Sequence, residues 1–159
     1  MSAERPRTLI VVRHAHRDRP PGRDRDNGLS PKGEKQSRRV LKLFKERFGE
    51  EKGTAPLILS SPKIRCMETL VPIARWTEAP VRVTPLLDEG GDVDAKVARF
   101  LTEWRAGKGA LTVLCSHGDV IPVLLQAATG ARADLSKGGW AEIEFDGGPP
   151  MLTWLVQEP

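Results

Sequence analysis

The sequence has no tyrosine, and its only aromatic residues are four tryptophans and four phenylalanines in 159 residues. Proteins that bind single-stranded nucleic acid stack the bases on aromatic side chains, so this scarcity argues against that class of function. The net charge of +4, from 25 basic and 21 acidic residues, suits an anionic partner but is modest for a dedicated nucleic-acid binder. We therefore expect an anionic partner other than nucleic acid.

Cysteine and long apolar runs are also scarce. The two cysteines, Cys66 and Cys115, are too few for a disulfide framework and lack metal-ligand spacing, so we expect two reduced, buried thiols. No uninterrupted apolar stretch approaches the roughly 18 to 20 residues of a membrane-spanning helix. The polar start MSAERPRT does not have the form of a signal peptide. Together these absences predict a soluble cytoplasmic protein without membrane association.

Short β-rich runs alternate with amphipathic helical runs along the chain, whose length predicts a single domain over residues 1–159. The runs of strand length lie at 8–12, 56–60, 81–87 and 110–116. A helix is expected at about 119–129, and the segments 140–146 and 151–157 have the pattern of a terminal hairpin. This alternation predicts an α/β fold, a three-layer α/β/α sandwich with a mostly parallel central sheet and a C-terminal β-hairpin.

Two Ser-Pro pairs indicate helix starts. Ser30-Pro31 and Ser61-Pro62 each provide an N-cap residue followed by a proline at the first helical position. In the helix that follows the second pair, apolar residues lie at positions i, i+3, i+7 and i+10, namely Ile64, Met67, Val71 and Ala74. We expect these residues to form its apolar face.

Three of the strand runs end in polar residues that are capable of chemistry. The first ends in Arg13-His14-Ala15 and the second in Ser60-Ser61-Pro62, with Arg65 one helical turn further on. The fourth ends in Ser116-His117-Gly118. Because ligands bind outside the carboxyl ends of parallel strands, two of the three histidines should meet two arginines at one edge of the sheet.

These four side chains have complementary chemistry. Guanidinium groups are permanently charged forks that fit phosphate oxygens. A neutral imidazole is a nucleophile toward phosphorus, and neighbouring cations lower its pKa and keep it unprotonated. A second imidazole can donate a hydrogen bond to an equatorial oxygen as the phosphoryl group transfers. The set predicts phosphoryl transfer through a phosphohistidine, with no metal and no cofactor.

Three alternatives remain open for the same residues. His14 and His117 could bind a metal, but arginines beside both would repel a cation and no carboxylate lies at ligand spacing. Both could be structural, although strand-end turns are not apolar faces. A non-catalytic module could also bind phosphate or nucleic acid through an arginine-rich loop, but such a module needs no nucleophile.

Four motifs resemble those of the histidine phosphatase (phosphoglycerate mutase-like) superfamily, in the order of that family. They are RHA at 13–15, LSPKG at 29–33 with Gln36, SSPKIRCMET at 60–69 and SHG at 116–118. The alanine after the first histidine is similar to the small SixA-like phosphatase branch. The chain lacks the insertions that cap the sugar-phosphate mutases, so the resemblance implies a phosphatase with an open site.

The resemblance also implies roles for the matched residues. His14 would be the phosphorylated nucleophile, and Arg13, Arg65 and His117 would complete the phosphate pocket. The proton donor of the family is usually a carboxylate in a Leu-x-Glu stretch, which Leu87-Asp88-Glu89 matches. Glu89 is therefore the expected catalytic acid.

Four further residues are candidates for contact with substrate. Asp88 is the neighbouring alternative to Glu89 as the acid, and a pair of acids in a glycine-rich turn is otherwise simply solvated. Gly118 follows the second histidine. His16 and Arg17 follow the first motif, although a solvated loop histidine is the competing reading for His16.

The loop after the first motif interleaves arginines with aspartates. Its charged residues are Arg17, Arg19, Arg23, Arg25, Asp18, Asp24 and Asp26. It is either a solvated loop with internal ion pairs or a rim that attracts a second phosphate, a nucleotide or an acidic protein surface.

The substrate class stays open between three partners: a phosphorylated small molecule, a nucleotide or a phosphohistidine protein. The SixA-like resemblance implies protein phosphohistidine. The run SHGDVIP at 116–122 also resembles phosphatase domains linked to Nudix hydrolases, which implies nucleotides.

Overall fold

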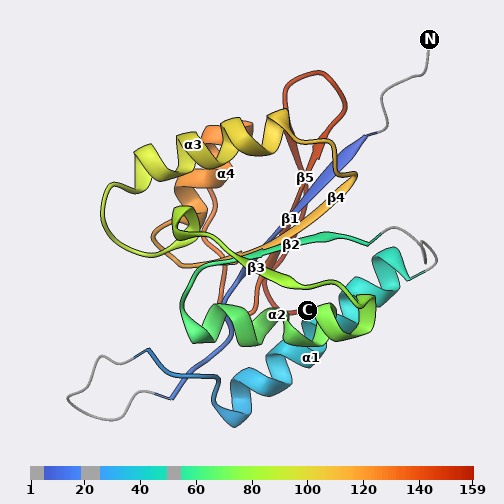
Figure 1. Cartoon of the computed structure of the whole chain (residues 1–159), viewed down its shortest axis with the longest axis vertical. Helices are drawn as coiled ribbons and strands as arrows, with labels where there is room; N and C mark the ends of the chain where they lie inside the picture. Colours follow the sequence, from blue (N-terminus) through green and yellow to red (C-terminus); the bar gives the residue numbers. More distant parts are fainter. Residues whose placement is uncertain (1–5, 19–25, 50–54) are drawn as a thin grey trace.

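A six-stranded sheet forms the centre of the molecule in the computed structural model, which describes residues 6–18, 26–49 and 55–159 (Figure 1). The strands are β1 (Arg7–Arg13), β2 (Leu57–Ser60), β3 (Val81–Val83), β4 (Leu111–Ser116), β5 (Trp140–Phe145) and β6 (Met151–Val156). The helices are α1 (Pro31–Phe48), α2 (Ile64–Thr77), α3 (Val93–Ala106) and α4 (Ile121–Thr129), with a short 3-10 helix η1 (Pro85–Leu87). Along the sheet the strand order is β3-β2-β4-β1-β5-β6.

The first four strands of the chain run parallel. β4 pairs in parallel with both β1 and β2, and β2 pairs in parallel with β3. The hairpin of β5 and β6 continues the sheet antiparallel to β1. The register sets Arg13 beside Ser116 and Ser60 beside Cys115, so three strands end at one edge of the sheet. The predicted mostly parallel sheet with a C-terminal hairpin is confirmed.

Helices cover both faces of this sheet, with α1 and α2 on one side and α3 and α4 on the other (Figure 1). Successive residues of a strand point to opposite faces, so Leu9 and Val11 of β1 pack in the cluster of α3 and α4. Ile10 and Val12 pack in the cluster of α1 and α2. The predicted three-layer α/β/α architecture is therefore confirmed.

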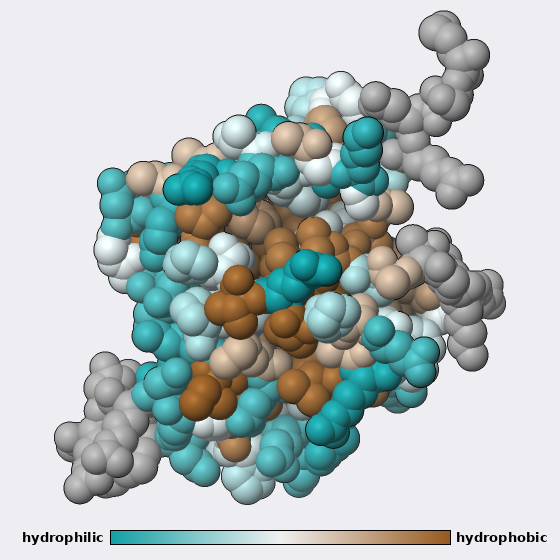
Figure 2. Space-filling model, in the orientation of Figure 1, coloured by the Kyte–Doolittle hydropathy of each residue, from teal (hydrophilic) through white to brown (hydrophobic). Residues whose placement is uncertain are grey.

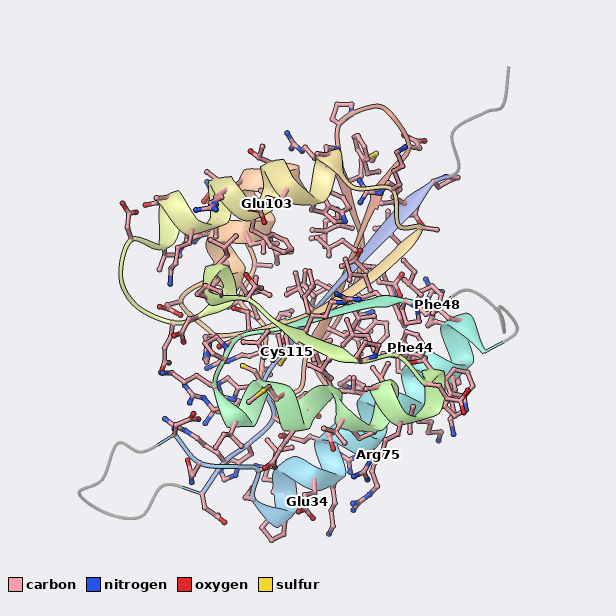
Figure 3. The ribbon with its side chains drawn as sticks, viewed as in Figure 1. Glu34, Phe44, Phe48, Arg75, Glu103 and Cys115 are labelled. Atoms are coloured by element: carbon pink, nitrogen blue, oxygen red, sulfur yellow. The ribbon has the colours of Figure 1, made fainter. Side chains whose placement is uncertain are left out.

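The core on the α1 side contains aromatic rings and both thiols. The rings of Phe44 and Phe48 lie 5.3 Å apart between centroids near the C-terminal half of α1, and Phe44 belongs to the same buried cluster as Cys115 (Figure 3). Cys66 and Cys115 are buried and form no disulfide, as predicted.

The prediction for the buried face of α2 is wrong: the face that the helix buries is offset by about one residue from the predicted apolar face. The side chains that α2 buries are Arg65, Cys66, Thr69, Leu70 and Ile73. Ile64, which was predicted to face inward, is exposed. The buried stripe is partly polar because it delivers Arg65 and Thr69 toward the end of β1, and an apolar pattern cannot reveal such a stripe.

The start of α2 also differs from the prediction. The helix begins at Ile64 with Lys63 as its N-cap, and Lys63 makes no side-chain capping bond. Instead, Asp26 Oδ1 accepts the Ile64 N–H at 2.8 Å, so a residue from a distant loop caps the helix. The Ser61 hydroxyl accepts the Lys63 N–H at 3.3 Å, just before the helix, and also pairs with His117. In α1, by contrast, Ser30 is the N-cap as predicted, and its side chain accepts the Gly33 N–H.

Apolar side chains gather on the surface over the edge strand β3 (Figure 2). Val83 of β3 is 51% exposed, and Leu57 at the start of the neighbouring β2 is exposed as well. None of the helices in the described ranges is long and apolar enough to cross a membrane.

Candidate active site

The candidate site lies where β1, β2 and β4 end. The His14 N–H donates to Ser116 O at 3.1 Å, and the Ser61 N–H donates to Cys115 O at 3.1 Å. These backbone bonds hold the first residue after β1 and the first residue after β2 against β4. The predicted meeting of the strand-end motifs therefore occurs, at the edge where α/β folds bind their ligands.

A pocket of about 420 Å³ opens at this edge. The residues that line it and that the sequence had singled out are Arg13, His14, Arg17, Arg65, Glu89, His117 and Gly118. The two imidazole rings lie 5.4 Å apart between centroids. The structure thus brings both histidines, both arginines and the expected acid to one cavity.

His14 is held in one tautomer. Its Nδ1 lies 2.9 Å from the carbonyl oxygen of Ala15, which can only accept, so Nδ1 carries the proton and Nε2 keeps its lone pair. Burial, together with the electrostatic influence of Arg65, His117 and Arg13, lowers the pKa of His14 from 6.5 to about 3, although the bond to Ala15 opposes this shift. At neutral pH the His14 imidazole is consequently neutral, with an unprotonated Nε2.

The two arginines bring guanidinium groups to the pocket from the end of β1 and from the first turn of α2. Arg13 Nη1 donates to Leu135 O at 2.9 Å, and the guanidinium lies over Gly118, where an added Cβ would come within 2.9 Å of Arg13 Nη2. Arg65 is 2% exposed, and its Nη2 lies 2.8 Å from Glu89 Oε2. Within the described part of the chain, the buried Nε of each arginine has no hydrogen-bond partner. Buried N–H groups need acceptors, and phosphoryl oxygens fit that need.

His117 is buried between Ser61 and Glu89. Its Nε2 lies 2.7 Å from Ser61 Oγ, and its Nδ1 lies 3.5 Å from Glu89 Oε2. Arg65 Nη2 lies 3.3 Å from the same Nδ1, so this nitrogen faces both charged groups of the pocket, while Nε2 pairs with the Ser61 hydroxyl. Ser61 therefore supports the second histidine, a contact that the sequence interpretation of Ser61 as a helix cap did not include.

Glu89, rather than Asp88, faces the pocket. Glu89 is 44% exposed and lines the cavity, whereas the Asp88 carboxylate lies 3.8 Å from Lys63 Nζ and 3.5 Å from Ser61 Oγ. Partial burial raises the pKa of Glu89, but the hydrogen bond and charge of Arg65, with His117 and Lys63, lower it below its usual range overall. Without a ligand Glu89 is thus a carboxylate paired with Arg65.

The turn that carries Glu89 is fixed from the His117 side. The Gly90 N–H donates to Asp119 Oδ2 at 2.8 Å, and Asp119 itself lines the pocket. Gly90 and Gly91 have φ values of +73° and +67°, a left-handed conformation that other residues adopt at a cost. The glycine-rich turn therefore holds the Glu89 carboxylate in place at the pocket.

His16 does not line this pocket. Its Nδ1 lies 2.6 Å from Ser30 Oγ, and its backbone N–H donates to Gln36 Oε1 at 2.8 Å. An added Cβ on Gly33 would lie 1.9 Å from His16 O, so only glycine lets α1 approach so closely. The Ser30, Gly33 and Gln36 element thus anchors the segment after His14, and His16 borders a neighbouring pocket instead.

The charged loop is described only at its two ends. Arg17 is nearly buried, lines the pocket and pairs in a β-bridge with Leu29. The expected rim residues Arg19, Arg23, Asp24 and Arg25 lie outside the described residues.

Four lining residues were not anticipated from the sequence: Asp119, Asp134, Leu135 and Lys137. The last three precede Gly138-Gly139, and that glycine pair before a strand was the one available signal. Among the described residues, no group of three or more His, Cys, Asp or Glu side chains could hold a metal ion.

Comparison with known proteins identifies a family and a relative that this chain resembles. The profile of the Histidine phosphatase superfamily (branch 1) matches residues 9–92. An 8-oxo-(d)GTP phosphatase from Mycolicibacterium smegmatis is 31% identical over 124 residues, which cover 76% of this chain. The match spans 37% of the length of that relative.

Solved structures agree in fold. A mycobacterial glucosyl-3-phosphoglycerate phosphatase superposes with a TM-score of 0.74 at 20% identity, over 98% of this chain and 100% of the other. The protein histidine phosphatase SixA, complexed with tungstate, gives a TM-score of 0.76 at 20% identity, over 95% and 97% of the two chains.

Proposed function

The chain belongs to the histidine phosphatase superfamily, branch 1, and on that premise we propose that it is a metal-independent phosphatase that works through a phosphohistidine on His14. The observation that carries the proposal is the fixed tautomer of His14, whose Nδ1 is committed to Ala15 O inside a pocket with two arginines and a second histidine. This arrangement leaves Nε2 as the reacting atom.

In the first half of the proposed reaction, Arg13 and Arg65 hold the phosphoryl oxygens while the His14 Nε2 lone pair attacks phosphorus. The bond between phosphorus and the leaving oxygen breaks, and that oxygen takes a proton from Glu89. His117 donates to an equatorial oxygen and stabilises the charge that spreads over the transferring group.

Glu89 must be protonated for this step, although it is ionised in the free site. A phosphoryl dianion in the pocket competes for Arg65 and adds a like charge beside the carboxylate, and both effects raise the pKa of Glu89. Binding of the substrate would thus prepare the acid. After the leaving group departs, the Glu89 carboxylate removes a proton from water, the water oxygen attacks phosphorus, and His14 is released with free phosphate.

The proposed substrate is a phosphomonoester or a protein phosphohistidine. The fold similarity to SixA supports this choice. A nucleotide is the second candidate, because the matched relative in Mycolicibacterium smegmatis is named an 8-oxo-(d)GTP phosphatase.

Hydrolysis of p-nitrophenyl phosphate tests the reaction class. We expect the rate with excess EDTA to stay within about twofold of the rate without it, since no proposed step uses a metal-bound water or a Lewis acid. Activity that EDTA removes would sink the mechanism. An inactive protein that binds RNA or DNA in a salt-sensitive way would favour the non-catalytic module instead.

A further inference from the structure

The pocket lined by His14, Arg65 and His117 is called the phosphoryl pocket below. A second pocket, which we call the α1 pocket, adjoins it and takes part in no step of the proposed reaction. Its volume is about 310 Å³, and it lies between α1, the segment before β5 and the segment after β6. Lys137 lines both pockets, so the two cavities share a border.

That border is tied to the strand that carries the nucleophile. The Gly138 N–H points at the carbonyl oxygens of Arg13 and His14, at 3.1 and 3.3 Å. Gly138 has a φ of +77°, and an added Cβ would lie 3.2 Å from Gln36 Cβ, so the position requires glycine. The border thus has a fixed place relative to His14.

The outer side of the same segment is pinned as well. Gln157 Oε1 accepts the Ser136 N–H at 2.6 Å, and Gln157 Nε2 donates to Asp134 O at 2.8 Å. Asp134 belongs to the phosphoryl pocket and Ser136 to the α1 pocket. The two cavities are therefore formed together, before any ligand arrives, as binding sites for small molecules usually are.

The charge of the α1 pocket is suited to an anion. Lys32 and Arg39 are exposed and lie seven residues apart on α1, which places them on one face of the helix, two turns apart. With Lys137 they bring three basic side chains to the cavity, against one acidic side chain, that of Glu158, beside the terminal residue Pro159. Ammonium and guanidinium groups in such a hollow recognise phosphate and carboxylate oxygens.

Resting on the proposed phosphatase activity, we propose that the α1 pocket binds a second anionic group of the substrate. The enzyme would then act on a small phosphorylated molecule that carries another phosphoryl or carboxylate group. Two adjoining hollows suit a small molecule that spans them, whereas a protein bearing phosphohistidine would be met by a broader, flatter contact.

Three nucleotides that differ in their second phosphoryl group serve as probes. Adenosine 5′-monophosphate has none, adenosine 5′-diphosphate has one adjacent to the first, and adenosine 3′,5′-bisphosphate has one across the sugar. The variant Lys32→Ala/Arg39→Ala removes two cations of the pocket. Its matched control is Lys35→Ala/Arg38→Ala, since Lys35 and Arg38 are exposed on the same helix and line neither pocket.

For at least one doubly phosphorylated probe, we expect the ratio of its kcat/KM to that of the monophosphate to fall by about tenfold or more in Lys32→Ala/Arg39→Ala. The same ratio should stay at the wild-type value in Lys35→Ala/Arg38→Ala. Equal ratios in the two double variants, for both probes, would overturn the proposal.

Failure of the catalytic proposal is separable from failure of this one. If the wild-type protein hydrolyses none of the nucleotides, the same ratio is taken from their dissociation constants, measured by calorimetry on the same proteins. A ratio that falls only in Lys32→Ala/Arg39→Ala supports the α1 pocket without catalysis, and a ratio equal in both variants rejects it.

Discussion

Replacement of His14 by alanine is expected to lower kcat/KM for p-nitrophenyl phosphate by about 10⁴-fold or more. The change removes the atom that forms the covalent intermediate, and loss of a nucleophile has effects of this order. The measurement is steady-state kinetics in EDTA, with thermal unfolding to show that the variant still folds.

His16→Ala is the control for this result. It makes the same chemical change two residues further on, at a side chain that bonds Ser30 and does not line the phosphoryl pocket. We expect its kcat/KM for this substrate, which has a single phosphoryl group, to stay within about tenfold of the wild-type value, because the side chain contacts Ser30 rather than the phosphoryl pocket and its loss acts mainly through stability. A His14→Ala protein as active as His16→Ala would exclude His14 as the nucleophile.

The second large effect is expected from Glu89→Gln, and it should depend on the leaving group. An alkyl phosphomonoester needs a proton on its departing oxygen, so its kcat/KM should fall by about 10²- to 10⁴-fold. The imidazole of a phosphohistidine peptide leaves with less help, so its kcat/KM should fall much less. Comparison of kcat/KM, which reports the first phosphoryl transfer, keeps the later attack of water out of the result.

Asp88→Asn separates the two adjacent acids. The Asp88 carboxylate approaches Ser61 and Lys63 rather than the pocket, so its loss should slow both substrates by a similar, smaller factor. A dependence on the leaving group in Asp88→Asn, and none in Glu89→Gln, would reassign the proton donor to Asp88.

The architecture was predictable because its signals are local. A run such as residues 8–12 shows a buried parallel strand by its apolar length, and the residue after it stands at the carboxyl edge whatever the rest of the chain does. The convergence of Arg13, His14 and His117 followed from that rule alone. Arg65 lies beside them because α2, which carries it, begins shortly after the end of β2.

The errors occurred where a polar residue had a structural partner far along the chain. The buried stripe of α2 includes Arg65 and Thr69, so apolar spacing pointed to its neighbours instead. The Ala15 N–H donates to Thr69 Oγ1 at 3.0 Å across 54 residues of sequence, and spacing could not predict this bond. In the same way, the Ser61 hydroxyl pairs with the distant His117 in addition to the Lys63 N–H, and spacing could not predict that second contact.

The segment 134–137, which also lines the site, could not be predicted from the sequence for another reason. Asp134 and Lys137 lie in a segment without helix or strand periodicity, so nothing in the pattern places them. Their position depends on the Gly138 bonds to the end of β1, which exist only once the hairpin has joined the sheet. The α1 pocket depends on the same contacts, so it could not be predicted from the sequence either.

The covalent intermediate is the centre of the account, and trapping it is the most direct test. Glu89→Gln protein, in which the attack of water is slowed, is mixed with p-nitrophenyl phosphate, quenched in alkali and analysed by mass spectrometry of its peptides. The account predicts a phosphoryl group on the peptide that contains His14, stable in alkali and lost in acid. A phosphoryl group on another residue, or none while turnover proceeds, would contradict it.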